Sequence, residues 1–154
     1  MKTSEAVTPN HPDKICDRIS DKILDEALKQ DKNSRVAVEA MGGHSKVTVM
    51  GELTTDAEID VEKIVKEVTG EDYEVEINIT TQSNEIANGV DDGGAGDQGI
   101  MVGYACNENE AMIPHESYLA KDLCKFIYNK YPVDGKTQIT INDKNEIVDV
   151  VASF

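Results

Sequence analysis

The stretch "TPNHPDKICDRISDKILDEALKQD", residues 8–31, carries the clearest structural pattern in the chain. Its apolar side chains recur every four residues, and neither glycine nor an internal proline interrupts them: Ile15, Ile19, Ile23 and Ala27. This spacing places them on one face of a helix and predicts a helix over residues 12–30. Pro12 suits the first helical position, where its missing N–H group is not needed, so Asn10 or His11 is expected to cap the helix.

The entrance of this predicted helix has two readings. A helix N-terminus presents unpaired N–H groups and binds anions, so His11 is placed to hold a phosphate oxygen and Asp13 could be an oxygen ligand for Mg²⁺. The ordinary alternative is a well-capped helix, in which an acid in the first turn contributes about 0.3–1 kcal/mol of stability without any function. Asp13, Asp17, Asp21 and Asp25 recur every four residues, as a solvated helix face also does.

The segments that follow alternate between strand and helix patterns. Two β-branched runs around Gly42 and Gly43 predict a hairpin over residues 35–53. Thr55 and Glu58 have capping-box spacing and predict the start of a second helix, which ends before Gly70. Residues 73–81 alternate apolar and polar side chains, which predicts a strand with one face in water.

In the second half, residues 84–99 form a predicted loop, residues 100–106 a short strand, and residues 116–131 an amphipathic helix. Residues 136–154 are expected to be a hairpin that turns at Asn142 to Asn145. Helix followed by hairpin thus occurs twice, over residues 12–53 and 116–152. We predict an α+β fold in which a mainly antiparallel sheet is covered by helices.

Composition and charge restrict the possible partners. The chain has 154 residues, with 15 basic and 30 acidic side chains and a formal net charge of −15. Nucleic-acid backbones and anionic membranes should therefore be repelled. The N-terminus lacks the apolar region of a signal peptide, and no apolar run approaches the roughly 18 residues of a membrane span. Three cysteines without metal-site spacing favour a reducing compartment, so we expect a soluble, cytoplasmic protein.

Three further features are weak by themselves. The stretch "GGAGDQG" could let the backbone approach a ligand or form a lid, and it could equally be a linker; Asp97 lies within it. Glu39 interrupts an apolar run, and strict alternation puts it on the face opposite Val38, where a solvent-facing acid is ordinary. Lys136 stands at the entry of a predicted strand, which is usually a surface position.

Taken in order, four stretches resemble the S-adenosylmethionine synthetase family. They are "TSEAVTPNHPDKICDRISDKILDEAL", "VAVEAMGGHSKVTVMGELTT", "GAGDQGIMVGYACNENEAMIP" and "DGKTQITI", and they extend over most of the chain. Family members join ATP to methionine, release the whole triphosphate, and then hydrolyse it to phosphate and pyrophosphate. The resemblance covers only the N-terminal portion of such an enzyme, with an N-terminal region over residues 1–90 and the beginning of a central region over 91–154.

The resemblance implies roles for individual residues. His11 would contact the triphosphate near the departing oxygen, and Asp13 would bind Mg²⁺. Lys136, with Asp134 beside it, would bind phosphate. Glu39 would bind the activating K⁺ ion.

The family resemblance also implies a methionine pocket and a gating loop. Glu52 would contact methionine, and Asp97 would line the pocket for adenosine and methionine. Asn88 stands where the family usually has a glutamine that contacts methionine, at the start of a gating loop near residues 88–97. This loop is shorter than is usual in the family.

The second half of the family's active site has no counterpart in this sequence. A fragment would therefore act as a homodimer or in complex with a chain that carries the missing half. The alternative is a non-catalytic nucleotide-binding or regulatory paralogue that pairs with a full synthetase. A third possibility is a domain that retains no function.

Overall fold

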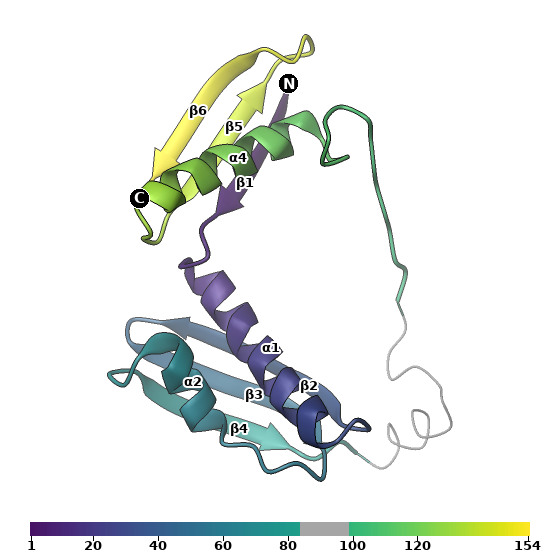
Figure 1. The fold of residues 1–154 in the computed structure, drawn as a ribbon, viewed down its shortest axis with the longest axis vertical. Coiled ribbons are helices and arrows are strands. Elements are labelled where there is room, and N and C mark those ends of the chain that lie inside the picture. Colours follow the sequence, from purple (N-terminus) through teal and green to yellow (C-terminus); the bar gives the residue numbers. More distant parts are fainter. Residues whose placement is uncertain (84–98) are drawn as a thin grey trace. The chain divides into compact units, whose positions relative to one another are not determined.

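The computed structural model describes residues 1–83 and 99–154, which fall into two compact units. The first unit combines Met1–Lys14 with Met101–Phe154, and the second unit is Ile15–Ile100. The first unit is therefore built from both ends of the chain (Figure 1).

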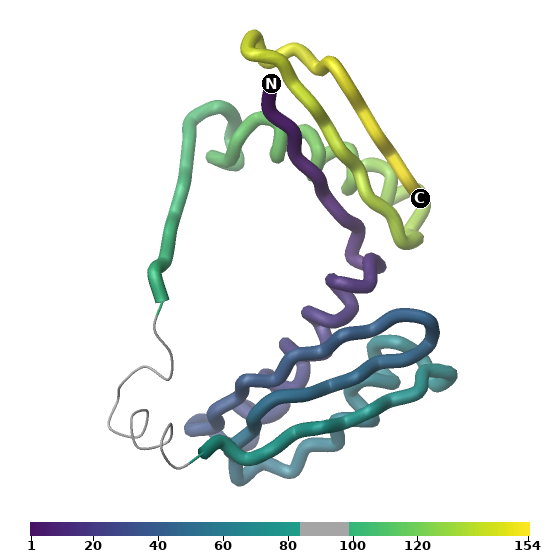
Figure 2. The backbone as a smooth tube through the Cα atoms, turned by 180° about the vertical axis from the view of Figure 1, so that it is seen from behind, coloured from purple at the N-terminus to yellow at the C-terminus, as the bar shows by residue number. Residues whose placement is uncertain are grey.

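The second unit is a three-stranded sheet with two helices on one face. Its strands are β2 (Arg35–Gly43), β3 (Lys46–Thr54) and β4 (Glu74–Thr80), and they lie in the order β2-β3-β4 (Figure 2). β2 and β3 are antiparallel, whereas β3 and β4 are parallel because α2 (Val61–Thr69) crosses over between them. Helix α1 (Pro12–Gln30) and α2 bury one core with the sheet: Ile19, Ile23, Val38, Val47, Val49, Val61, Ile64 and Val65. The predicted helix over residues 12–30 is confirmed.

The hairpin between β2 and β3 turns two residues later than the sequence suggested. His44 and Ser45 form the turn with φ values of 51° and 59°, whereas Gly42 and Gly43 are paired within the ladder. Gly42 is closely packed, because a Cβ atom there would lie 3.1 Å from Val47 Cγ2. Gly42 therefore permits close approach, Gly43 has open space around it, and neither makes the turn.

The expected capping box at Thr55 and Glu58 is wrong. Helix α2 begins at Val61, and its N-cap is Asp60, whose Oδ1 accepts a hydrogen bond from the Lys63 N–H group at 3.0 Å. The Thr55 hydroxyl instead accepts from the backbone N–H of Ala57 at 3.0 Å. The end of α2 before Gly70 agrees with the prediction.

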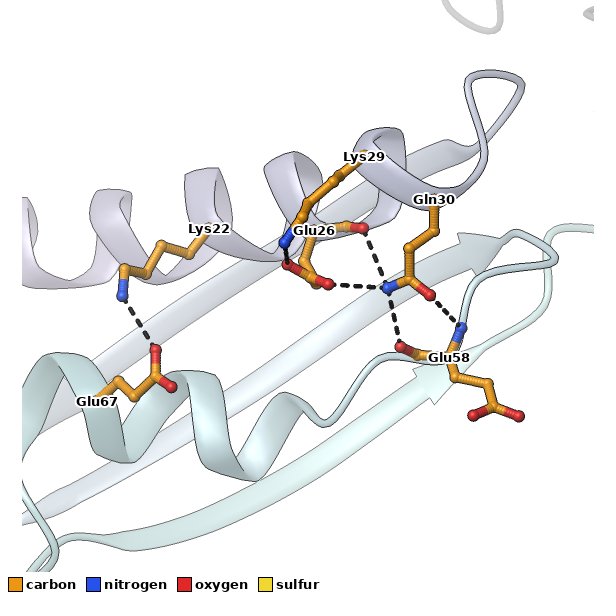
Figure 3. A network of polar contacts seen from close by, with 6 residues as sticks. All are labelled: Lys22, Glu26, Lys29, Gln30, Glu58 and Glu67. Carbon is orange, nitrogen blue, oxygen red and sulfur yellow. Dashed lines mark hydrogen bonds and ion pairs between the residues drawn. The ribbon is translucent and has the colours of Figure 1, made fainter.

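Polar contacts join α1 to the segment around α2 (Figure 3). The Gln30 amide donates to the Glu58 carbonyl oxygen at 3.1 Å and accepts from the Glu58 N–H group at 3.3 Å. Lys22 and Glu67 form an ion pair at 3.2 Å. These contacts hold the helices beside each other above the apolar core.

The first unit is a smaller antiparallel sheet under one helix. Its strands are β1 (Lys2–Val7), β5 (Lys136–Ile141) and β6 (Ile147–Ser153), in the order β1-β5-β6. Helix α4 (His115–Lys130) packs on β1 and β5, and its buried cluster is Ala120, Ile139 and Ile141. The turn at Asn142 to Asn145 is confirmed, since the Asn145 N–H group donates to the Asn142 carbonyl at 3.0 Å. The predicted α+β class is confirmed, and helix followed by hairpin occurs twice, as α1-β2-β3 and α4-β5-β6.

One predicted strand is absent, and one strand of the first unit was missed. Residues 100–106 contain no strand, and Ile100, Met101, Val102 and Tyr104 are largely exposed. No strand of residues 1–83 or 99–154 pairs with this run, and an unpaired run leaves its backbone to water. Conversely, β1 was not predicted, although it forms the edge of the sheet.

Within the described ranges, none of the helices combines the length and the apolar character needed to cross a membrane.

Candidate active site

The two predicted phosphate-contacting segments meet at one end of the first unit's sheet. Val7, the last residue of β1, pairs with Lys136, the first residue of β5. Beyond this pair, the Thr8 N–H group donates to the Gly135 carbonyl at 2.9 Å, and the Gly135 N–H group donates to Thr8 Oγ1 at 3.2 Å. Thr8 is completely buried. The chain before α1 and the chain before β5 are thus fastened together by three consecutive contacts.

The loop that leads into α1 is held against the same segment. The Asn10 amide donates to the Pro132 carbonyl at 2.9 Å, and the Tyr128 hydroxyl of α4 donates to Asn10 Oδ1 at 3.4 Å. A tight turn follows, in which the His11 N–H group donates to the Thr8 carbonyl at 3.0 Å. The helix entrance is therefore held by three hydrogen bonds within the first unit.

His11 caps α1 with its own ring. Its Nδ1 accepts a hydrogen bond from the Asp13 N–H group at 3.2 Å, and it lies 3.6 Å from Asp13 Oδ2. A neutral imidazole that accepts at Nδ1 carries its proton on Nε2. Nε2 is then a directed donor, and 21% of the side chain remains exposed to a ligand. The cap and the anion donor proposed from the sequence are compatible roles of one residue.

Asp13 projects into solvent, with 82% of its side chain exposed. In the part of the chain that the structure describes, no group of three or more His, Cys, Asp or Glu side chains could hold a metal ion. Asp13 alone fits one position of a Mg²⁺ site, because this ion is commonly held by one or two carboxylates together with substrate phosphates and water. The described residues do not make a complete metal site.

Lys136 lies on the face of the sheet away from α4, where its Nζ is 3.8 Å from Glu5 Oε2. Both side chains are about half-exposed, and an ion pair of this kind is weak enough for an anionic ligand to replace Glu5. Asp134 is exposed next to it. Between them, Gly135 is covered by the Phe154 ring, since a Cβ atom at residue 135 would lie 2.4 Å from Phe154 Cδ1. A larger residue here would require the Phe154 ring to move.

Glu39 and Glu52 belong to the second unit and share the sheet face that the helices leave bare. Glu39 pairs with Met50, and Ala37 pairs with Glu52, so the two carboxylates occupy diagonal positions on neighbouring strands. Val38 is buried on the opposite face, as alternation predicted, and Glu39 is exposed. Two like charges at diagonal positions favour a cation between or beside them.

The remaining predicted site residues, Asn88 and Asp97, lie outside the described residues, as does the expected gating loop near 88–97. The structure therefore brings together His11, Asp13, Asp134 and Lys136 in one unit and Glu39 with Glu52 in the other. Sequence reasoning missed Thr8 and Gly135, and it considered Asn10 only as a cap, whereas Asn10 binds Pro132 and His11 is the cap. Thr8 and its partner Gly135 are 127 residues apart, so no local pattern could have identified them.

The whole chain is similar to S-adenosylmethionine synthetases. Residues 1–93 match the family model for the S-adenosylmethionine synthetase N-terminal domain, and residues 92–153 match the model for the central domain. The chain belongs to the S-adenosylmethionine synthetase family.

Individual relatives agree with this assignment. Proteins named S-adenosylmethionine synthase from Mesoplasma florum and Finegoldia magna are 41% and 38% identical, each over 94% of this chain. The match covers 45% and 46% of those proteins. The solved structure of an unusual S-adenosylmethionine synthetase from Campylobacter jejuni superposes with a TM-score of 0.84 at 33% identity, over 98% of this chain and 47% of that one. This chain thus spans about half the length of its relatives.

Proposed function

We propose that this chain supplies the first half of a methionine adenosyltransferase, which forms S-adenosylmethionine from ATP and methionine and releases phosphate and pyrophosphate. The observation that carries the proposal is the joint at Thr8 and Gly135, which fastens the entrance of α1 to the start of β5. In a member of this family, that joint groups a histidine, a lysine and a helix N-terminus at one end of a sheet.

The reaction needs cations and donors around its leaving group. When the methionine sulfur attacks the ribose C5′ of ATP, the bond to the triphosphate oxygen breaks and negative charge develops on that oxygen. Preorganised donors aimed at such a charge are a large source of rate enhancement. The His11 Nε2–H group and the Lys136 ammonium are these donors in our proposal, and the N-terminus of α1 adds its unpaired N–H groups.

The acids have the complementary task of holding cations and methionine. Asp13 would provide a carboxylate oxygen for Mg²⁺, which when bound would offset part of the triphosphate charge. Glu39 would bind K⁺, and the Glu52 carboxylate would bind the ammonium group of methionine. Asn88 and Asp97 would complete the methionine and adenosine pocket.

The described residues offer this site few cations, so we propose that a second chain completes it. His11, Lys136 and the helix terminus face a triphosphate of several negative charges, in a chain whose own net charge is −15. A chain that carries the second half of a synthetase would add the missing groups, whereas a homodimer would add a second copy of the groups described here.

An activity assay with a matched lysine control tests this proposal. The chain is incubated with ATP, methionine, Mg²⁺ and K⁺, alone and with the second half of a family enzyme, and S-adenosylmethionine is measured by mass spectrometry. We expect product only in the second mixture, with a loss of about 10²-fold or more for His11→Ala and Lys136→Met. Lys144→Met should change little, because Lys144 lies in the turn at the other end of β5. Absence of product in both mixtures would refute the proposal.

The weak cation set favours a second candidate, a non-catalytic paralogue that binds nucleotide or regulates a full synthetase. The specific observation is that Glu5 lies 3.8 Å from Lys136, so a triphosphate would first have to displace this carboxylate. Calorimetric titration with a non-hydrolysable ATP analogue, and a pull-down with a full-length synthetase, would separate the two. Binding without product in any mixture would support this candidate, and no binding of either kind would remove it.

A further inference from the structure

A small hollow in the first unit lies between helix α4 and the chain that leaves β1. Its volume is about 150 Å³, and it is lined by Val7, Pro9, Lys121, Cys124, Lys125 and Tyr128. The four α4 residues follow one another at spacings of three and one and three, which places them on one face of the helix. All six lining residues belong to the first unit, so the hollow is formed by packing within that unit.

The walls of this hollow are mainly apolar and include one aromatic ring. Val7 and Pro9 supply aliphatic surface, and Tyr128 contributes its ring. Lys121 and Lys125 are exposed, so their alkyl chains border the hollow while their ammonium groups reach water. An apolar hollow with cations at its rim suits a ligand that has an apolar body and an anionic group.

The two lysines carry charges that no described acid neutralises. Lys22 of α1, by comparison, forms an ion pair with Glu67 at 3.2 Å. Lys121 and Lys125 have no such pair within the described residues, although the chain has 30 acidic and only 15 basic side chains. Because like charges one helical turn apart repel each other, an anion between them would remove an unfavourable interaction.

The volume of the hollow limits the size of its ligand. Pockets that hold drug-sized ligands measure about 300–1,000 Å³. The hollow, at about 150 Å³, is too small for a nucleotide and suits a single ring or a short branched chain. The Tyr128 ring favours an aromatic body, because aromatic rings pack on each other in offset or edge-to-face arrangements.

The hollow is connected to the entrance of α1. Pro9 lies between Thr8, which is completely buried, and Asn10. The Tyr128 hydroxyl donates to Asn10 Oδ1 at 3.4 Å. A ligand that packs against Pro9 and Tyr128 would limit the motion of both, and so it would stabilise the turn that precedes His11.

We propose that this hollow binds a small aromatic carboxylate and that binding stabilises the turn before α1. The ring would pack against Pro9 and Tyr128, and the carboxylate would lie between the ammonium groups of the two lysines. None of the lining residues is assigned to ATP, methionine or a metal ion by the proposed function. The inference therefore does not depend on that function.

Benzoate is the probe for this site, and two related compounds separate its parts. Benzamide has the same ring without the charge, and acetate has the charge without the ring. Each compound is titrated into the full 154-residue chain, and amide and methyl shifts are followed by NMR. We expect benzoate to bind with a Kd on the order of 1 mM, and benzamide and acetate to bind at least about fivefold more weakly. The largest shift changes should lie at Val7 and along residues 121–128.

Two double substitutions that change the net charge equally test the rim of the hollow. Lys121→Met with Lys125→Met should weaken benzoate binding about fivefold or more. Lys130→Met with Lys144→Met should weaken it less than about twofold, because neither of these lysines lines the hollow. All four lysines are exposed, so neither double substitution should prevent folding.

Tyr128→Phe tests the connection to the entrance of α1. It keeps the ring that lines the hollow but removes the hydroxyl that donates to Asn10. At about 10 mM benzoate, the hydrogen exchange of the His11 amide, which donates to the Thr8 carbonyl, should slow about threefold or more in the unchanged chain. In Tyr128→Phe, benzoate should still bind, and the slowing should fall below about twofold.

Several results would overturn the proposal. They are equal binding of benzoate and benzamide, equal effects of the two double substitutions, shift changes centred outside the hollow, and no benzoate binding at about 20 mM. Binding that leaves the exchange of the His11 amide unchanged would also overturn it. None of these measurements involves the formation of S-adenosylmethionine, so failure of this site and failure of the proposed function are separate outcomes.

Discussion

Replacing Thr8 by valine should loosen the joint on which the candidate site is built. Valine keeps the shape of threonine but removes the Oγ1 atom that accepts the Gly135 N–H group at 3.2 Å. Since Thr8 is completely buried, that N–H group loses its partner where water cannot replace it. A buried donor left in this way costs about 1–3 kcal/mol.

This cost should be visible in thermal unfolding. For a unit of roughly 70 residues, each kcal/mol corresponds to a fall in Tm of about 4–8 °C. The unfolding of the first unit is followed by amide hydrogen exchange in β5, which separates it from the unfolding of the second unit.

Thr3→Val is the control for the same chemical change on the same strand. The Thr3 hydroxyl lies 2.9 Å from the Thr140 hydroxyl at an exposed position, where water can replace it, so its loss should cost less than about 0.5 kcal/mol. If Thr8→Val were no more destabilising than Thr3→Val, the joint at Gly135 would not stabilise the site and our reasoning would be refuted.

Three other substitutions and reactions test separate parts of the fold. Gly51→Ala should lower the free energy of unfolding by about 3 kcal/mol or more in denaturant titrations, because the new Cβ atom would lie 2.1 Å from a backbone oxygen of β2 and the residue has a φ of 138°. The control is Gly43→Ala, which should cost under about 1 kcal/mol because the space around Gly43 is open. Backbone N–H groups of Asn33 and Asp56 hold the pKa of Asp31 below its usual value, so this carboxylate stabilises the fold above about pH 3.9 and the stabilisation is lost as the pH falls through the lowered pKa. Asp31→Asn should therefore be destabilising at pH 7 and nearly neutral at the acid end of a urea titration series; an equal effect at both pH values would contradict the assignment. Burial raises the pKa of the Cys124 thiol, so in the folded chain it should react with a thiol reagent more slowly than the partly exposed cysteines, and an equal rate would show that α4 opens readily.

The sequence predicted best those elements whose signals are local and repeated. Helix α1 was predicted with the observed bounds because its four apolar residues face one core, and the faces of β2 followed from alternation around Val38. The end of α2 followed from Gly70, a residue suited to its φ of 99°.

The wrong and missed predictions concern residues that form contacts with segments far away in the sequence. Thr55 resembles a helix cap, but its hydroxyl lies 2.6 Å from the Ser34 hydroxyl, a contact between segments 21 residues apart. Strand β1 shows little apolar alternation and becomes a strand because β5, more than 120 residues later, pairs with it. Such pairings depend on tertiary contacts, and the propensities of a short stretch of sequence do not reveal them.

The candidate site shows the same division. The residue types at the entrance of α1 suggested both an anion site and an ordinary cap, and the His11 ring performs the cap while leaving Nε2 to donate. The association of this entrance with Lys136 came only from the family resemblance. Its physical cause, the buried contact between Thr8 and Gly135, has no sequence signature.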